Sequence, residues 1–386
     1  MAGENGAFEV VYYDVAERRL ALTGATLSRR LEQGKGIWRL DLPRLDDERL
    51  ELEQAGGPAS PPTRVARLLP AFLRGSTPEP VLRLQVQRDG GSDQVEVLEG
   101  LDRTEAFAVE PGRLDETVLT LIGNFEEPAA EPIGRLRAML ERQYTQILLH
   151  DPGVRLDLDP EDVHRLRVAA RRARAVLRAA RPLLDPEWSE PLRAELKWLG
   201  GSLGPRRDLD VLVARLKDQI VELELPEQTA AKALVDSLEH EREAAQALAV
   251  EALSSERYLQ LLNALEAGAR APSVRQSEVS LSKLAEREFR RLRKAAERLG
   301  PDSTDEELHR ARILGKRARY AAELAEPEIG KAAGRVVARA KALQDVLGAH
   351  QDAIVAEARL RGLLADAPGS GAAFAAGRLV ERERER

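Results

Sequence analysis

The feature that most constrains this chain is an internal repeat of helical blocks. "VHRLRVAARRARAVL" from residue 163 matches "LHRARILGKRARYAA" from residue 308 at an offset of 145. The preceding segments, "LERQY" and "AEREF", share that offset, and "SLGPRRDLDVLV" (202–213) matches "VLGAHQDAIVAE" (346–357) at an offset of 144. Matched blocks at a nearly constant offset indicate a duplicated structural unit. We therefore expect a tandem of two similar four-helix bundles with pseudo-two-fold symmetry.

The repeat sets the expected organisation from residue 133 onward, where almost every segment has helical periodicity. Asp159 can cap the helix that carries the first block, and Pro160 suits its first turn. We predict an all-α region over 133–365. Its repeat halves cover about 133–222 and 280–365, a helical hairpin over about 223–279 connects them, and 366–386 forms a flexible charged tail.

The first 122 residues have a different pattern. "FEVVYYDV", "GIWRLDLP", "VLRLQVQRDG", "QVEVLEG" and "TEAFAVEPG" alternate apolar and polar residues and end in turn formers, which is typical of strands. One helix is predicted at "PTRVARLLPAFLRG". We expect a small antiparallel β-rich domain over 1–122, a linker over 123–132, and an α+β multidomain fold overall.

Basic residues form one stripe along each repeated helix. At 100° per residue the first stripe spans about 80° of the helix surface. Its members are His164, Arg167, Arg171, Arg174 and Arg178, and the second stripe contains His309, Arg312, Lys316 and Arg319, bordered by Tyr320. Leu166, Ala169, Ala170, Ala173, Val176 and Leu177 form the opposite, core face of the first helix, and Leu314, Ala318, Ala321 and Ala322 that of the second.

Most charged helix stripes are simply solvated, but a solvated stripe usually alternates acids with bases, which relieves repulsion. Neither stripe has acids between residues 164 and 181 or between 309 and 320, although the chain has a net charge of −6. We therefore expect an anionic ligand in a basic groove between the stripes. A docking face for an acidic protein is the alternative if no small anion binds.

The second repeated block supports an anion site. In "LGPRRDLD", Gly204 can end one helix and Pro205 can begin the next, so Arg206 and Arg207 would lie near a helix N-terminus, where phosphate is favoured. The matching position in the second half is His350. Asp208 and Asp352 would orient neighbouring bases or cap the helix.

Composition excludes several classes of function. The chain has no cysteine, which removes thiol catalysis and thiolate metal sites. No run is apolar and long enough to span a membrane, and no signal peptide is evident, so we expect a cytoplasmic protein. No nucleophile and base pair recurs in the helical part. No catalytic residue, metal ligand or cofactor is therefore assigned.

The repeated blocks closely resemble the CHAD domain, the conserved histidine α-helical domain, over about residues 133–365. The resemblance implies two four-helix bundles with a basic central surface that binds inorganic polyphosphate, and recruitment to polyphosphate granules. It implies that the two stripes, Arg206, Arg207 and His350 line the site. His350 and Gln351 depart from the bases usual there, which implies weaker or pH-sensitive local binding.

Residues 12–43 and the segment "PPTRVARLLPAFLRG" resemble the CYTH domain, the triphosphate tunnel fold. The resemblance implies a metal-dependent triphosphatase, but the E-x-E-x-K motif is missing and Asp41 replaces the tunnel lysine. Glu110 alone remains of a later E-x-E pair. Without clustered carboxylates, two divalent ions cannot be held against a triphosphate. We expect a truncated, catalytically inactive domain, with Arg29, Arg30 and Arg39 as its candidate anion contacts.

The leading interpretation is a polyphosphate-binding protein that is not an enzyme. Metal-dependent triphosphatase or polyphosphatase activity of the β-rich domain is the alternative. Specific nucleic-acid binding ranks last, because single-strand sites interleave aromatics for base stacking and only Tyr320 borders the stripes.

Overall fold

The structure is a computed structural model of the 386-residue chain. It describes residues 6–32, 34–44, 48–88, 92–100, 106–110, 113–122, 132–222, 224–275, 280–300, 302–365, 374 and 377–381. The chain divides into two compact units, described here one at a time. The first contains 1–127 together with 145–158 and 253–262, and the second contains 128–144, 159–252 and 263–386.

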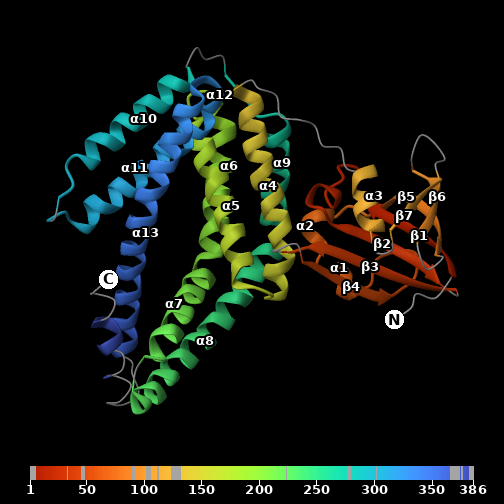
Figure 1. The fold of residues 1–386 in the computed structure, drawn as a ribbon, viewed down its shortest axis with the longest axis horizontal. Coiled ribbons are helices and arrows are strands. Elements are labelled where there is room, and N and C mark those ends of the chain that lie inside the picture. Colours follow the sequence, from red (N-terminus) through yellow and green to blue (C-terminus); the bar gives the residue numbers. More distant parts are fainter. Residues whose placement is uncertain are drawn as a thin grey trace. The chain divides into compact units, whose positions relative to one another are not determined.

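The first unit contains a seven-stranded antiparallel sheet, which confirms the predicted fold class for this part of the chain (Figure 1). The sheet order is β4-β3-β2-β1-β5-β6-β7. The strands are β1 (Gly6–Asp14), β2 (Thr26–Glu32), β3 (Lys35–Pro43), β4 (Arg49–Ala55), β5 (Glu79–Arg88), β6 (Asp93–Glu99) and β7 (Ala106–Val109).

Short helices pack apolar residues against this sheet. The helix predicted at 62–75 is two helices, α1 (Thr63–Ala66) and α2 (Pro70–Leu73), because Pro70 begins a new turn. Their Val65 and Phe72 are buried. A third helix, α3 (Leu114–Ile122), was not predicted from the sequence, and its Val118 joins the apolar cluster of β1, β5, β6 and β7. Most of the predicted linker, 123–131, lies outside the described residues.

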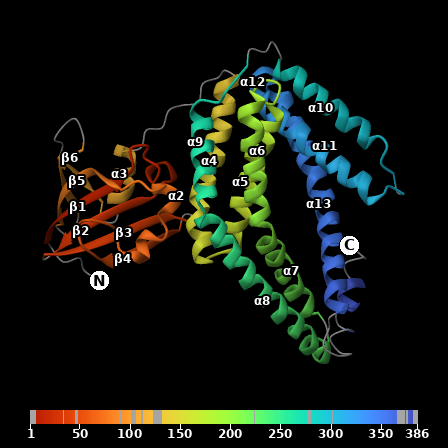
Figure 2. The same cartoon turned by 180° about the vertical axis from the view of Figure 1, so that it is seen from behind.

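Helices make up the rest of the described chain (Figures 1 and 2). The first half contains α4 (Pro132–Leu156), α5 (Pro160–Ala179), α6 (Pro186–Ser202) and α7 (Gly204–Ile220). α8 (Leu225–Ser254) and α9 (Glu256–Arg270) follow, and then α10 (Leu281–Ala296), α11 (Asp305–Leu324), α12 (Glu326–Ile329) and α13 (Lys331–Ala365). Among the described helices, none combines the length and the apolar character needed to cross a bilayer.

The repeated helices begin as their sequences predict. Asp159 caps α5 by accepting a hydrogen bond from the Glu161 backbone N–H at 2.8 Å, with Pro160 in the first turn. Thr304 caps α11 in a reciprocal capping box with Glu307. Each such cap stabilises its helix by about 1 kcal/mol. Both helices therefore begin five residues or fewer before their stripe histidine.

Three details of the predicted layout differ from the structure. Figures 1 and 2 show α9 running onward from α8 rather than folding back beside it, so the predicted hairpin over 223–279 is wrong. α13 runs unbroken through 346–357, where the first half breaks between α6 and α7, because Ala349 replaces Pro205. The tail is not wholly flexible, since 377–381 is helical and buries Leu379.

Candidate functional site

Helices α5 and α11 carry the two basic stripes and pack against each other in the second unit. Every predicted core residue of α5 is buried, from Leu166 to Leu177. Ala318, Ala321 and Ala322 are buried on α11, while Leu314 is only partly buried. Small buried side chains let neighbouring helices come close. The two sequence-related helices therefore meet, and their basic residues project from opposite sides toward shared space.

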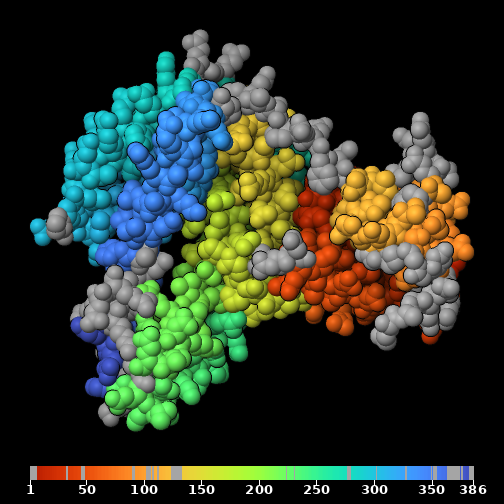
Figure 3. Space-filling view, viewed as in Figure 1, coloured from red at the N-terminus to blue at the C-terminus, as the bar shows by residue number. Residues whose placement is uncertain are grey.

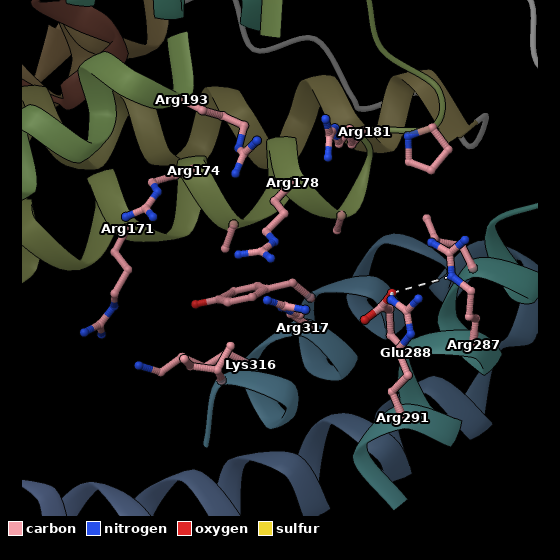
Figure 4. Close-up of a pocket in the computed structure, with 16 residues that line it drawn as sticks. Arg171, Arg174, Arg178, Arg181, Arg193, Arg287, Glu288, Arg291, Lys316 and Arg317 are labelled. Carbon is pink, nitrogen blue, oxygen red and sulfur yellow. Dashed lines mark hydrogen bonds and ion pairs between the residues drawn. The ribbon is translucent and has the colours of Figure 1, made fainter. Parts of the chain in front are cut away.

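A cavity of about 540 Å³ lies between these helices, α6 and α10 (Figure 4). Figure 3 shows this helical unit hollowed between its blue part, α11 to α13, and its green part, α5 to α8. Nine basic side chains and one carboxylate line the cavity. They are Arg171, Arg174, Arg178, Arg181, Arg193, Arg287, Arg291, Lys316, Arg317 and Glu288.

Two carboxylates, Glu190 and Glu288, neutralise part of the charge of four of these basic residues. Glu190 pairs with Arg193 at 2.5 Å and with Arg181 at 3.2 Å. Glu288 pairs with Arg291 at 2.8 Å and lies 3.6 Å from Arg287.

A further group of arginines lacks such neighbours. Within the part of the chain that the structure describes, Arg171, Arg174, Arg178 and Arg317 have no carboxylate at ion-pair distance. We call these four the open arginines. Figure 4 shows Arg174 and Arg178 pointing from α5 into the cavity that Lys316 and Arg317 enter from the facing helix. The cavity therefore holds a marked excess of positive charge.

Burial and neighbouring positive charges lower the pKa of two arginines in the site. Desolvation lowers the pKa of Arg171, and Tyr320 raises it in part. The charges of Arg167, Arg312 and Arg319 lower it further. The pKa of Arg178 is lowered in the same way, by desolvation and then by Arg317, Arg193 and Arg174. Each adjacent like-charged pair on a helix costs about 0.2–0.5 kcal/mol. An anion in the cavity would remove this cost.

His164 lies at the first turn of the α5 stripe and is half-buried. Desolvation lowers its pKa, and the positive charge of Arg207 lowers it further. Glu161 raises the pKa in part, and Arg171 lowers it by less. His164 is therefore mainly neutral at pH 7. Arg207 of α7 is half-buried and close enough to act on it.

The other predicted stripe residues have different surroundings. Arg167 donates a hydrogen bond to Asp208 at 3.0 Å. Asp208 therefore orients a neighbouring base, which is one of the two roles predicted for it. Arg319 donates to Gln344 and to the Tyr320 hydroxyl at 3.0 Å, and its guanidinium lies 4.7 Å from the Tyr320 ring centroid. Tyr320 lines the cavity, while Arg319 does not. Arg319 therefore holds the Tyr320 side chain in position without lining the cavity itself.

Arg206 is a correction to the predicted site. Its side chain is completely buried, forms an ion pair with Asp210 one turn later, and donates to Gln246 at 3.1 Å. Arg242 also donates to Asp210, at 3.0 Å. A buried, compensated guanidinium cannot contact a ligand, so Arg206 joins α7 to α8 instead.

The second half places its predicted histidines at the periphery. His309 is exposed on the first turns of α11, and Arg312 is half-buried near Arg171. His350 lies within the unbroken α13, with Nε2 3.1 Å from an Asp305 carboxylate oxygen. Without a helix start beside it, His350 lacks the backbone N–H groups that the repeat predicted for this position.

Sequence reasoning missed the contributions of α6 and α10. Arg193, Arg287 and Arg291 line the cavity, but their segments have no stripe matched between the two halves. Arg181 and Arg317 were visible in the repeated blocks and lie beside the stripes. Only the packing of α10 against α11 brings its arginines to the site.

The sheet of the first unit forms a separate cavity of about 260 Å³. Arg39, one of the candidate anion contacts, lies 2.9 Å from Glu51 and 3.5 Å from both Asp41 and Asp115. Asp41, in place of the expected lysine, also accepts from Arg49 at 2.6 Å. Glu51 and Glu53 of β4 line this cavity and were missed from the sequence. Among the described residues, no group of three or more histidines and carboxylates could hold a metal ion.

Comparisons with known proteins agree with this architecture. Two curated relatives from Mycobacterium tuberculosis, the uncharacterized proteins MT2285 and Rv2226, are 27% identical over 428 aligned positions, covering 91% of this chain and 81% of each relative. Two solved structures, PptA from Streptomyces chartreusis and the CHAD domain from the plant Ricinus communis, each superpose with a TM-score of 0.55 at 25% identity. They cover 67% and 68% of this chain and 95% and 90% of their own.

The N-terminal antiparallel sheet fits a CYTH-like domain. The family model of the CHAD domain matches residues 138–361, more than half of the chain and the whole of the basic cavity. The chain therefore belongs to the CHAD family.

Proposed function

We propose that the cavity between α5, α6, α10 and α11 binds inorganic polyphosphate without chemical turnover. The observation that carries the proposal is the convergence of the four open arginines and Lys316 from both halves of the repeat on one cavity. Membership of the CHAD family supports this ligand class. Recruitment of the protein to polyphosphate granules is part of the same proposal.

The chemistry of the lining favours a phosphate chain over other anions. Arginine presents several N–H donors in a planar fork that matches phosphate oxygens. Several guanidinium groups along one helix can each contact a different phosphate of a linear chain. Among the described residues that line the cavity, Tyr320 is the one aromatic side chain, so base stacking contributes little and nucleic acid is disfavoured.

The testing experiment is calorimetric titration with long-chain polyphosphate at about 150 mM salt, where weak surface attraction is screened. We expect the Arg171→Glu/Lys316→Glu variant to bind about a hundredfold more weakly or worse, because two charge-assisted contacts become repulsive. The matched control is Lys217→Glu/Lys232→Glu, which makes the same charge change at exposed sites outside the cavity. Circular dichroism verifies that each variant is folded.

The same samples test the competing functions. An excess of oligonucleotide should leave polyphosphate bound, and tripolyphosphate with Mg²⁺ or Mn²⁺ should release no phosphate. Absence of polyphosphate binding by the wild type would overturn the proposal, and equal weakening in both double variants would show that the cavity is not the site.

The arrangement in the first unit supports a binding protein over a triphosphatase. The Arg39 guanidinium lies among Asp41, Glu51 and Asp115, which already supply its counter-charge. A triphosphate entering this cavity would have to displace these carboxylates from Arg39 and would meet their negative charge. We propose that this cavity is a structural remnant of the tunnel and does not catalyse hydrolysis.

A further inference from the structure

A third basic stripe lies on α10, outside the two stripes of the repeat. Lys283, Arg287, Arg290 and Lys294 are spaced i, i+4, i+7 and i+11, so they fall within about 60° of one another on the helix surface. All four are exposed. The core face of α10, with Leu281, Leu284, Ala285, Glu288 and Leu292, lies on the opposite side. We call these four basic residues the α10 stripe.

Positive charge on this helix exceeds what its acids compensate. α10 contains six basic residues and two acidic ones. Glu286 lies 3.5 Å from Arg290, and Glu288 is shared by Arg287 and Arg291. Among the described residues, Lys283 and Lys294 have no carboxylate partner.

The α10 stripe is continuous with the main cavity. A groove of about 460 Å³ runs along it, lined by Lys283, Leu284, Arg287, Arg290, Arg291 and Lys294. Arg287 and Arg291 line both this groove and the main cavity, and Figure 4 shows them at the edge of the cavity on the α10 side. From Lys283 to Lys294 the stripe extends about 16 Å along the helix.

The first half of the repeat has no counterpart to this stripe. At the offset of 145, its four positions correspond to Ala138, Arg142, Thr145 and Leu149 of α4, only one of which is basic. The extension therefore comes from one half of the repeat only. Duplication of the stripes on α5 and α11 does not account for it.

We propose that the α10 stripe carries the part of a long phosphate chain that extends beyond the cavity, and so makes the protein prefer long polyphosphate to short. The inference rests on the proposed function of the cavity. A short chain such as tripolyphosphate is held by the cavity arginines alone. A long chain leaves past Arg287 and Arg291 and follows the exposed cations of α10.

The test compares tripolyphosphate with long-chain polyphosphate on the full chain. The variant is Lys283→Gln/Arg290→Gln/Lys294→Gln, which spares the two arginines shared with the cavity. We expect its affinity for the long chain to fall about tenfold or more, from the loss of three charge contacts, while its affinity for tripolyphosphate stays within about twofold. The slope of log affinity against log salt should decrease by up to about three for the long chain only.

The control is Lys217→Gln/Lys232→Gln/Arg361→Gln. It also removes three positive charges, at exposed sites outside the main cavity and outside the groove along α10. An equal loss for both ligands in the α10 variant, or an equal loss of long-chain affinity in the control, would overturn the inference. Wild-type protein that binds neither ligand would instead refute the proposed function of the cavity. Unchanged long-chain binding in the α10 variant would leave the cavity as the site and refute the α10 stripe.

Discussion

At the scale of single residues, charge compensation separates ligand-binding cations from structural ones. Arg206 and Arg171 both come from repeated basic blocks. Arg206 is buried against Asp210, whereas Arg171 faces the cavity and has no carboxylate partner among the described residues. An ion pair one turn apart was visible in the sequence as Arg206 and Asp210. Proximity to a helix N-terminus does not determine which side of the helix faces the core, and Arg206 lies on the buried side.

His164 provides a pH-dependent prediction. Its lowered pKa leaves it mainly neutral at pH 7, and protonation as the pH falls adds a positive charge beside the stripe. A bound polyanion favours the protonated form, so affinity should increase by about threefold to tenfold as the pH falls from 8 toward 5.5. Calorimetry across this range should show a flatter profile for His164→Gln than for the wild type.

His350→Gln is the matched control, because His350 lies on α13 beside Asp305, whereas His164 lies on α5 near Arg171 and Arg207. Parallel pH profiles for wild type and His164→Gln would show that another group controls the response.

At the scale of elements, the sequence predicted what depends on local periodicity and missed what depends on packing. The buried and basic faces of α5 follow from a period of 3.6, and both were placed correctly. β2 and β4 were missed. Arginines and glutamates make up three of the seven residues of each strand, and β4 is an edge strand with no fully buried residue. The positions of α6 and α10 around the cavity come from contacts between helices distant in sequence, which no local pattern contains.

The short helical segment at 377–381 shows how a few apolar residues can fix a charged terminus. Leu379 is fully buried in a cluster with residues of α7, α8 and α13, whereas Phe374 is 60% exposed. Leu379→Ala should lower the free energy of unfolding by about 2–4 kcal/mol. Phe374→Ala removes a larger side chain and should change it by less than about 0.5 kcal/mol.

Urea titration followed by circular dichroism measures both variants. Equal midpoints for Leu379→Ala and the wild type would mean that the segment does not stay packed in solution.

At the scale of the whole molecule, the repeat places like charges close together, and their repulsion lowers the free energy of unfolding. The net charge of −6 hides a strongly basic cavity, so bulk composition says little about the ligand. The repeat in the sequence was sufficient to predict a tandem helical fold and the α5 and α11 sides of the site.

Ligand binding should therefore stabilise the fold measurably. At a free polyphosphate concentration a hundred times Kd, the native state gains about 2.7 kcal/mol, which corresponds to a rise in Tm of about 5–10 °C for a unit of this size. Thermal melts followed at 222 nm test this. Arg171→Glu/Lys316→Glu should show no rise, and high salt should abolish the rise in the wild type. A rise of the same size in that variant would place binding elsewhere.

The contact between α5 and α11 has one more consequence. Nucleic acids and polypeptides have two chemically different ends. A site assembled from α5 and α11, two copies of one element, can match the chain direction of such a ligand along one of these helices only. A linear inorganic polyphosphate chain has two identical ends and therefore no direction. Both orientations of the proposed ligand in the cavity are therefore equivalent, and only the α10 stripe determines the side on which the rest of the chain leaves.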